Sequence, residues 1–272
     1  MSNYLKFTIL FIIAVLVNQP SNAQFGFSHE IGVITGPVQF RSDFGQRFNE
    51  ENNFGNTGYG IGIIHYINFS YRADCNCYTT DTYFNDHFKL RSEISYNKTN
   101  LDHFGEWVNE TQFGPDAQRL RAHSGVAENL DIGMQLEYFP LSIRAFSSHT
   151  GGWAPFVSLG VHYTMSSPQQ KTTYAPPGTI SDENIFNPNN VYQPWINASG
   201  GEYPIRTDKV NAFSMVTSIG TRYKLTILSD LMIDLRFQYY FNDWIDGLNH
   251  KLDSNKFNDH LVWLNVGYIL LI

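Results

Sequence analysis

The sequence has 272 residues, of which 42% are apolar, 15% aromatic and only 16% charged, a charged fraction well below the usual quarter. The net charge of -7 argues against nucleic-acid binding, because a protein that binds phosphate backbones needs a basic surface. The apolar content excludes a disordered chain, and two cysteines are too few for a disulfide framework.

The N-terminus has the pattern of a secretory signal peptide. Lys6 precedes the apolar run Phe7–Val17, and the small residues Ser21 and Ala23 follow it, as at a cleavage site. As a helix this run would rise only about 16 Å, against roughly 30 Å for a bilayer core, so it is too short for a membrane anchor. We expect cleavage after Ala23, which leaves residues 24–272 as one exported domain.

The rest of the chain alternates apolar and polar residues with the period of two that is typical of β-strands. The first stretch, near His29–Phe40, contains Gly36-Pro37, which predicts a bulge or an early end. The clearest stretch is 231–242, where apolar residues occupy the odd positions up to Phe241. Similar alternation marks the stretches 59–71, 88–97, 130–138, 156–165, 213–224 and 260–272. The sequence therefore predicts eight strands.

The connections between these strands alternate in length. The odd-numbered connections are longer than the even-numbered ones, although 41–56 exceeds 72–86 by only one residue. The odd-numbered connections are 41–56, 99–125, 167–209 and 243–259, and the even-numbered ones are 72–86, 139–152 and 225–229. Outer-membrane barrels keep short periplasmic turns and long outer loops, with apolar residues toward lipid, whereas a soluble lipocalin-like barrel points its apolar face inward. Alternation alone does not distinguish the two classes, but the connection lengths and the aromatic residues at strand ends favour the membrane barrel.

The predicted fold is therefore all-β, an antiparallel up-and-down transmembrane β-barrel with long extracellular loops. Eight strands are expected, and a further hairpin within 167–209 would make ten. The expected location is the outer membrane of a Gram-negative cell.

The polar face of the predicted strands carries charges that would fill the lumen. Eight strands enclose a space just wide enough for side chains, and the two signs are balanced, whereas an ion pathway would favour one sign. A salt-bridge network that plugs the barrel is therefore predicted, formed by Glu30, Lys89, Arg91, Glu93, Asp131, Glu137, Arg222, Lys224, Asp234 and Arg236.

No catalytic residue is predicted. His162 and Ser158 share the inward face and are the best candidates for a Ser/His pair, but no acidic partner or strained turn accompanies them. Asp102-His103 and Asp259-His260 resemble the Asp/His pairs of omptin proteases only in being neighbours. The chain is therefore expected to be non-catalytic, without a metal or cofactor; an outer-membrane enzyme acting on lipid or protein, or a narrow pore, is the alternative.

Both cysteines lie in the connection 72–86, as Cys75-Asn76-Cys77. A metal site of this type usually uses a second cysteine pair, so a strained disulfide, free thiols or an intermolecular bond all remain open. This connection is longer than a hairpin requires. It is a candidate for binding a periplasmic partner through Cys75, Cys77, Tyr78 and Tyr83, and the alternative is a longer hairpin that projects below the membrane.

Three short segments, Phe25–Val33, Asp131–Phe139 and Trp153–Val161, resemble small outer-membrane barrels of Bacteroidota, of which the PorG-like barrels associated with type IX secretion are the nearest family. The resemblance implies an accessory or anchoring subunit of a secretion or gliding complex. Its partners would be outer-membrane lipid and other envelope proteins. The family offers no catalytic residues to transfer.

Overall fold

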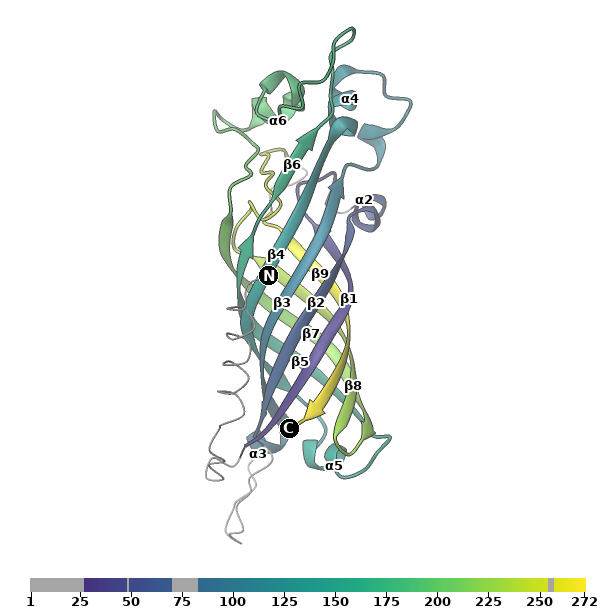
Figure 1. Ribbon diagram of the computed structural model, residues 1–272, viewed down its shortest axis with the longest axis vertical. Coiled ribbons are helices and arrows are strands. Elements are labelled where there is room, and N and C mark those ends of the chain that lie inside the picture. The colour runs from purple at the N-terminus through teal and green to yellow at the C-terminus, as the bar shows by residue number, and fades with distance from the viewer. Residues whose placement is uncertain (1–26, 48, 70–82, 254–256) are drawn as a thin grey trace, which may run out of the picture.

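The computed structural model describes residues 27–47, 49–69, 83–253 and 257–272. The predicted signal peptide, Cys75, Cys77 and Tyr78 lie outside these residues. The described chain forms one antiparallel sheet in the order β1-β2-β3-β4-β5-β7-β8-β9, with β6 paired to β4, and β9 pairs with β1, so the sheet closes into a barrel (Figure 1). Its strands are β1 (Ser28–Arg41), β2 (Thr57–Asn68), β3 (Phe88–Asp102), β4 (His123–Tyr138), β5 (Trp153–Ser166), β6 (Gln169–Thr172), β7 (Val210–Thr226), β8 (Ser229–Tyr240) and β9 (His260–Leu271).

The short strand β6 continues β5 rather than adding a wall to the barrel. Both strands pair with β4, β5 through Asn129↔Ser166 and β6 through Val126↔Gln169. The break between them falls at Ser167-Pro168, where proline has no N–H for the ladder. The prediction of eight walls is confirmed, and the described part of residues 167–209 contains no further hairpin of the barrel.

The prediction of a bulge or an early end at Gly36-Pro37 is wrong, because β1 continues to Arg41. The register of β1 with β9 is the same before and after this dipeptide, from Thr35↔Val266 to Val38↔Trp263. Gly36 is needed for another reason, because a Cβ atom there would lie 2.0 Å from the carbonyl oxygen of Leu264. The glycine therefore allows β1 and β9 to approach closely at the seam of the barrel.

The outer face of the barrel is apolar and the inner face is polar. On β8, Leu231, Ile233 and Leu235 are exposed, whereas Asp234 and Arg236 are buried in the lumen. The other strands alternate in the same way. An exposed apolar surface of this extent belongs in lipid rather than water, so the barrel is of the membrane-spanning type and not of the soluble type with an apolar interior.

Aromatic pairs mark the two edges of this apolar belt. At one edge, Trp153 and Tyr223 lie 4.9 Å apart, and at the other Tyr163 and Phe213 lie 5.3 Å apart. Phe213 and Tyr223 are ten residues apart on β7, which corresponds to about 33 Å along the strand and about 25 Å along the membrane normal at a tilt near 40°. That height matches the apolar band of outer-membrane barrels.

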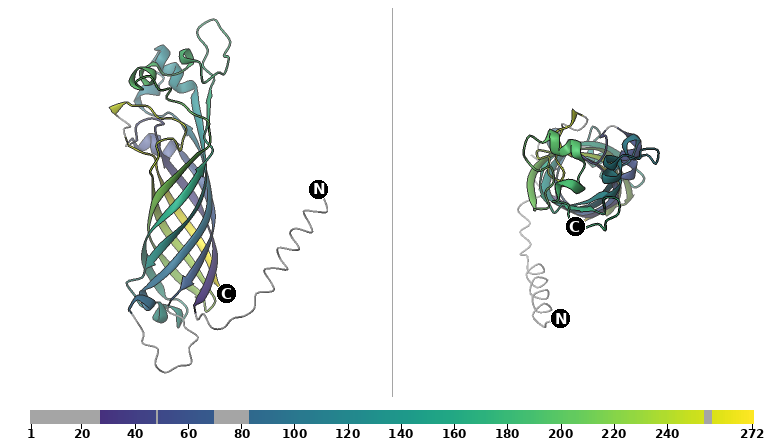
Figure 2. Two further views of the ribbon diagram at one scale, coloured as in Figure 1. Left: turned by 90° about the vertical axis from the view of Figure 1, so that its left-hand side faces the viewer. Right: turned by 90° about the horizontal axis from the view of Figure 1, so that it is seen from above.

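The two ends of the barrel differ. One end, here called the turn end, carries the C-terminus, α3 (Tyr83–His87) and α5 (Ile143–Ser147). The other, the loop end, carries α2 (Glu50–Gly55), α4 (Pro115–Ala122) and α6 (Gln193–Ala198), together with the short 3-10 segments Glu106–Val108 and Pro188–Asn190 (Figures 1 and 2). We call the connections at the loop end, residues 42–56, 103–122, 173–209 and 241–259, the head.

No helix in the described residues has both the length and the apolar character that crossing a bilayer would require.

Charge on the outer face should harm the protein more than charge in the lumen. Leu235 faces outward near the middle of β8, whereas the nearby Gln238 faces the lumen beside Asp131. Leu235→Arg should cost about 2–4 kcal/mol at mid-membrane and reduce the amount of folded barrel. Gln238→Arg should be milder, because the new cation meets an acidic side chain.

The measurement is the fraction of each variant that migrates as folded barrel on unheated gels and the thermal midpoint of the folded fraction. The reverse order of severity would show that the two faces have been exchanged.

Candidate functional site

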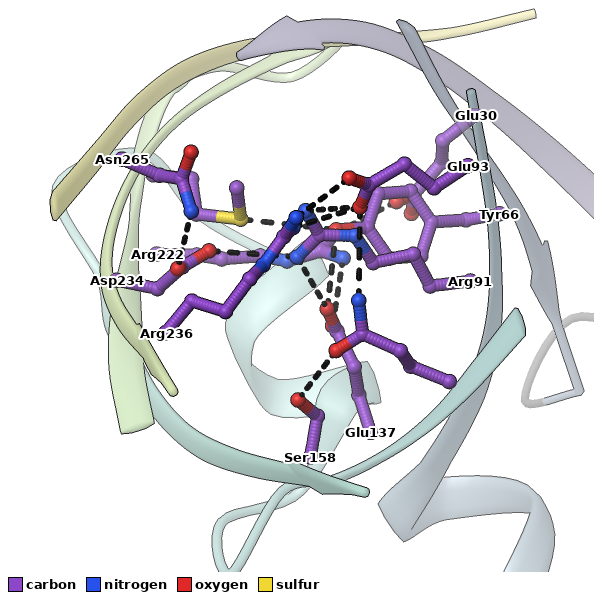
Figure 3. A network of polar contacts seen from close by, with 12 residues as sticks. Glu30, Tyr66, Arg91, Glu93, Glu137, Ser158, Arg222, Asp234, Arg236 and Asn265 are labelled. Atoms are coloured by element: carbon purple, nitrogen blue, oxygen red, sulfur yellow. Dashed lines mark hydrogen bonds and ion pairs between the residues drawn. The ribbon is translucent and has the colours of Figure 1, made fainter. Parts of the chain in front are cut away.

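The lumen contains a network of buried charges that come from opposite walls of the barrel. β3 and β4 supply one side and β7 and β8 the other, with Glu30 from β1. Figure 3 shows the central members of this network, among them Arg91, Arg222 and Arg236, pointing inward and meeting near the axis. All ten charged residues predicted for the lumen are buried, with at most 6% of their surface exposed.

Arg91 is the centre of the network. Its guanidinium contacts three carboxylates, those of Glu93 at 2.8 Å, Asp234 at 3.3 Å and Glu137 at 3.5 Å. Glu93 in turn accepts two hydrogen bonds of 2.6 Å from Arg236, one on each oxygen. This paired geometry is the strongest that arginine and a carboxylate can adopt, and it ties β3 to β8 across the lumen.

Arg222 extends the network toward the turn end. Its two terminal nitrogens contact Glu30 at 2.7 Å and Glu137 at 3.0 Å. Its guanidinium also lies 4.0 Å from the centre of the Tyr66 ring, within the range of a cation–π contact. Lys89 completes this part by pairing with Glu30 at 2.5 Å.

Asp131 does not join the ion pairs, although the sequence placed it among them. It accepts hydrogen bonds from Asn97, Thr164 and Gln238 instead. Its place is taken by Asp230, which contacts Lys224 at 2.8 Å and Arg222 at 3.8 Å. The alternation of β8 extended one step beyond Leu231 would have placed Asp230 on the inward face.

With Asp230 included, the connected network has five positive and five negative members. Burial of a lone charge costs several kcal/mol, whereas ion pairs with further hydrogen bonds recover much of that cost. The network therefore fills the lumen with matched charges, and it carries no excess of one sign that could select ions.

The inward Ser158 and His162 do not form a catalytic pair. Ser158 donates a hydrogen bond of 2.8 Å to Gln135 Oε1, and the His162 ring contacts the same glutamine amide at 3.3 Å. Gln135 therefore lies between them. In the described residues, Ser148 contacts His149 at 3.1 Å at the exposed turn end, without an acidic side chain bonded to that histidine.

A second buried charge cluster lies in the head and was not foreseen. Arg47 contacts Asp43 at 3.1 Å and Asp259 at 3.8 Å. The backbone N–H of Asp43 donates to Asp246 at 3.2 Å, and that of His250 donates to Asp43 at 3.0 Å. These contacts fasten the connection between β1 and β2 to the connection between β8 and β9.

The carboxylates of this cluster outnumber the guanidinium beside them. Burial, reinforced by Asp243, raises the pKa of Asp246 to about 7. Burial also raises the pKa of Asp43 and of Asp259 well above the usual range. Despite these acids, the described residues contain no group of three or more His, Cys, Asp or Glu side chains arranged to hold a metal ion.

Aromatic rings pack beside this cluster. Trp195 in α6 stacks on His250 with ring centres 5.4 Å apart and planes within 6° of parallel, and it also contacts His103 at 5.4 Å. The ring of His103 is hydrogen-bonded to that of His123 at 2.9 Å. Burial lowers the pKa of His103 and brings that of His250 to about 4, so both rings are neutral near pH 7.

Of the residues predicted to bind a periplasmic partner, Tyr83 is the one described. It lies in α3 at the turn end with 62% of its surface exposed. Its hydroxyl lies 2.6 Å from that of Tyr138, and its ring stacks on His87 at 4.0 Å. The tyrosine is thus held against the barrel with one face open.

Loss of one member of the lumen network should destabilise the barrel. Arg236→Ala leaves Glu93 with fewer partners in a buried site, and breaking a buried pair in this way costs about 3–5 kcal/mol. The thermal midpoint of the purified, detergent-solubilised protein should fall. Lys98→Ala, which removes an exposed ion pair to Glu128 on the outer face, is the matched control and should leave the midpoint nearly unchanged.

Stability of the head should depend on pH. A carboxyl whose folded pKa is raised, such as that of Asp246, stabilises the fold below its unfolded value near 3.8 and loses this contribution as the pH rises through about 7. His250 has the opposite effect. Its folded pKa is lowered to about 4, so its contribution to the stability of the head is present above pH 6.5 and is lost as the pH falls toward about 4. The two contributions change over the same pH range in opposite directions, so the contribution of Asp246 is measured by removing its charge.

Asp246→Asn should protect the head at pH 8 and change little near pH 4, where the carboxyl is protonated in the folded state and partly protonated in the unfolded state, as measured by hydrogen exchange of residues 241–253 corrected for the intrinsic pH effect. Asp208→Asn, at an exposed position of the head, is the control. An equal gain in protection at both pH values would contradict the assignment.

The fold and the lumen define the class, a small antiparallel barrel of the membrane-spanning type. No protein-family model matches the chain, and no curated sequence matches it.

Among solved structures, Neisserial surface protein A is 11% identical with a TM-score of 0.41, and the alignment covers 90% of this chain and 97% of that one. Ail of Yersinia pestis is 9% identical with a TM-score of 0.41, covering 91% and 100%. A major outer membrane protein of Thermus thermophilus is 13% identical with a TM-score of 0.41, covering 90% and 99%. At these values the likeness assigns no function, and the class rests on strand pairing and on the apolar outer face.

Proposed function

We propose that the protein is a non-catalytic, non-conducting barrel of the outer membrane that anchors its head outside the cell and serves as an accessory or anchoring subunit of an envelope complex. The observation that carries this proposal is the neutral network in the lumen. Arg91 meets carboxylates from three strands on two sides of the barrel, so the space that a pore would need is occupied by paired side chains.

The orientation follows from the unequal ends. Outer-membrane barrels have short turns in the periplasm and longer loops outside, and the two-residue turn between β7 and β8 at the turn end contrasts with the helix-bearing loops of the head. We therefore place the head outside the cell and Tyr83 in the periplasm. An anchoring role uses both ends, with the head displayed and the turn end available to a periplasmic or inner-membrane partner.

A complex of the type IX secretion or gliding class is the finer form of this proposal. Its support is the resemblance of three short segments to PorG-like barrels together with the long connection at the turn end that includes Cys75, Cys77 and Tyr78. Within this proposal that connection binds the partner, with the exposed face of Tyr83 beside it.

The purified wild-type protein should give no steady conductance in planar bilayers, because the charges in the lumen are paired and not lined up around water. Arg236→Ala should also remain closed, since Arg91 and its three partners stay in place. Regular single-channel steps from the wild type would overturn the non-conducting role.

The anchoring role is tested by affinity purification from cross-linked membranes. Replacement of residues 74–82 by Gly and Ser residues should leave folded barrel in the outer membrane and remove co-purifying envelope proteins. The same replacement of residues 177–181 in the head is the control and should retain them. Equal recovery of partners from both variants would place the interaction elsewhere.

A further inference from the structure

The head encloses a cavity of about 190 Å³ that none of the roles above uses. Its walls come from all four connections of the loop end, and include Asp43, Phe104, Trp107, Tyr192, Trp195 and His250. A cavity of about 150 Å³ can hold a benzene molecule. The space therefore suits a chemical group about the size of one ring.

Aromatic rings dominate the lining. Tyr192 stands nearly perpendicular to Trp195, with ring centres 5.3 Å apart and planes at 76°. Trp195 is almost fully buried, whereas Trp107 has 54% of its surface exposed. The cavity thus has a fixed aromatic wall and a second aromatic residue that solvent and ligands can reach.

The rings of Trp107, Tyr192 and Trp195 have no described Lys or Arg side chain stacked on them, unlike two other aromatic rings of the head. Arg119 lies 5.0 Å from the centre of Tyr174, and Arg206 lies 4.2 Å from the centre of Trp244. Among the described residues, no Lys or Arg side chain lines the cavity or stacks on its rings. One face of Trp195 is covered by His250, and a cation from outside would meet the remaining ring surface of the cavity without competition from a described cation of the chain.

The charge around the cavity favours the same kind of ligand. Asp43 lines it, and Asp246 and Asp259 lie in the same buried cluster, where Arg47 is the basic partner that contacts Asp43 and Asp259. The histidines in the lining are neutral near pH 7 and add no positive charge. The lining therefore offers an anion no positive charge. Burial raises the pKa of these three carboxyls, so they are partly protonated in the empty site, and a cation would be stabilised by the rings and by displacing a proton from the carboxyl of Asp43.

We propose that the cavity binds a small organic cation, an alkylammonium or quaternary ammonium group, held between Trp107, Tyr192 and Trp195 with the acidic cluster of Asp43 behind them. This site goes beyond the anchoring role, because the head could bind such a group whether or not the turn end recruits a partner. Loss of binding would leave the anchoring proposal unaffected.

The test compares choline with 3,3-dimethylbutan-1-ol, which has the same shape without the charge. Calorimetric titration of the folded full-length mature protein in a maltoside detergent, which carries no ammonium group, should show saturable binding of choline. The neutral alcohol should bind at least about fivefold more weakly, as expected when a cation–π attraction is removed. Equal binding of the two compounds would overturn the proposal in favour of a purely apolar site, and absence of saturable choline binding would also overturn it.

Variants locate the site. Trp107→Ala removes an exposed ring and should weaken choline binding about fivefold to tenfold, and Tyr192→Ala should act in the same direction. Phe113→Ala removes another highly exposed ring, 83% exposed, from the same connection but outside the lining, and should leave binding unchanged. Migration as folded barrel on unheated gels confirms that each variant is intact. Unchanged affinity in both lining variants would show that the cation binds elsewhere.

The source of the ammonium group is distinguished by two further probes. Tighter binding of phosphocholine than of choline would indicate a phosphocholine-bearing lipid or glycan, although the phosphate must then avoid the acidic cluster. Tighter binding of Nα-acetyl-lysine amide, whose side-chain ammonium group is free, would indicate a lysine side chain of a protein partner. Either preference supports a cation site and indicates the class of molecule that carries the ammonium group.

Discussion

The need to fill a narrow lumen with matched charges is the constraint on which the rest of this structure depends. Polar side chains from eight walls point at one axis, and water does not have the space to solvate them separately. Arg91 can be buried there because Glu93, Glu137 and Asp234 surround it. The same contacts connect β3, β4 and β8, so the charge balance and the closure of the barrel depend on each other.

The two faces of each strand therefore have different requirements. The outer face interacts with lipid through Leu, Ile, Val and aromatic side chains and needs little specificity. The inner face must bring each carboxylate to its own cation, and a shift of one residue in register would exchange the faces of a whole strand. Register in this barrel is therefore specified twice, by the apolar alternation and by the pairing of charges such as Arg236 with Glu93.

Much of the fold could be predicted from the sequence, because a strand between lipid and a polar lumen must alternate. That rule located the eight walls and the inward charges, but it gives no depth along the axis. Asp131 and Asp234 look equivalent in sequence, and only the register of neighbouring strands shows that one meets Asn97 and Thr164 while the other meets Arg91. At Gly36-Pro37 the local signal for a bulge was overridden by continuous pairing with β2, and the pairing with β9 keeps its register on either side of the dipeptide.

The head could not be predicted in the same way. Asp43 bonds to the backbone of His250, 207 residues later, and Trp195 reaches both His103 and His250. These contacts join irregular segments that have no period, so nothing in their own sequence shows which segment each will meet. In the sequence, Arg47, Asp43 and Asp259 are polar residues of predicted connections, and nothing there indicates that they form one buried cluster.

The strands β3 and β4 continue well beyond the apolar belt, and this sets how far the head stands from the membrane. On the outer face of β4 the belt ends between Leu130 and Glu128, where Glu128 pairs with Lys98. His123, whose ring centre lies 5.3 Å from that of Trp195, is seven residues before Leu130 on β4, or about 18 Å nearer the loop end at the usual strand rise and tilt. The headgroup layer of one leaflet is only about 5–8 Å thick. The aromatic cavity is therefore lifted clear of the lipid headgroups that surround the barrel, and a ligand must arrive from the medium or from a second surface.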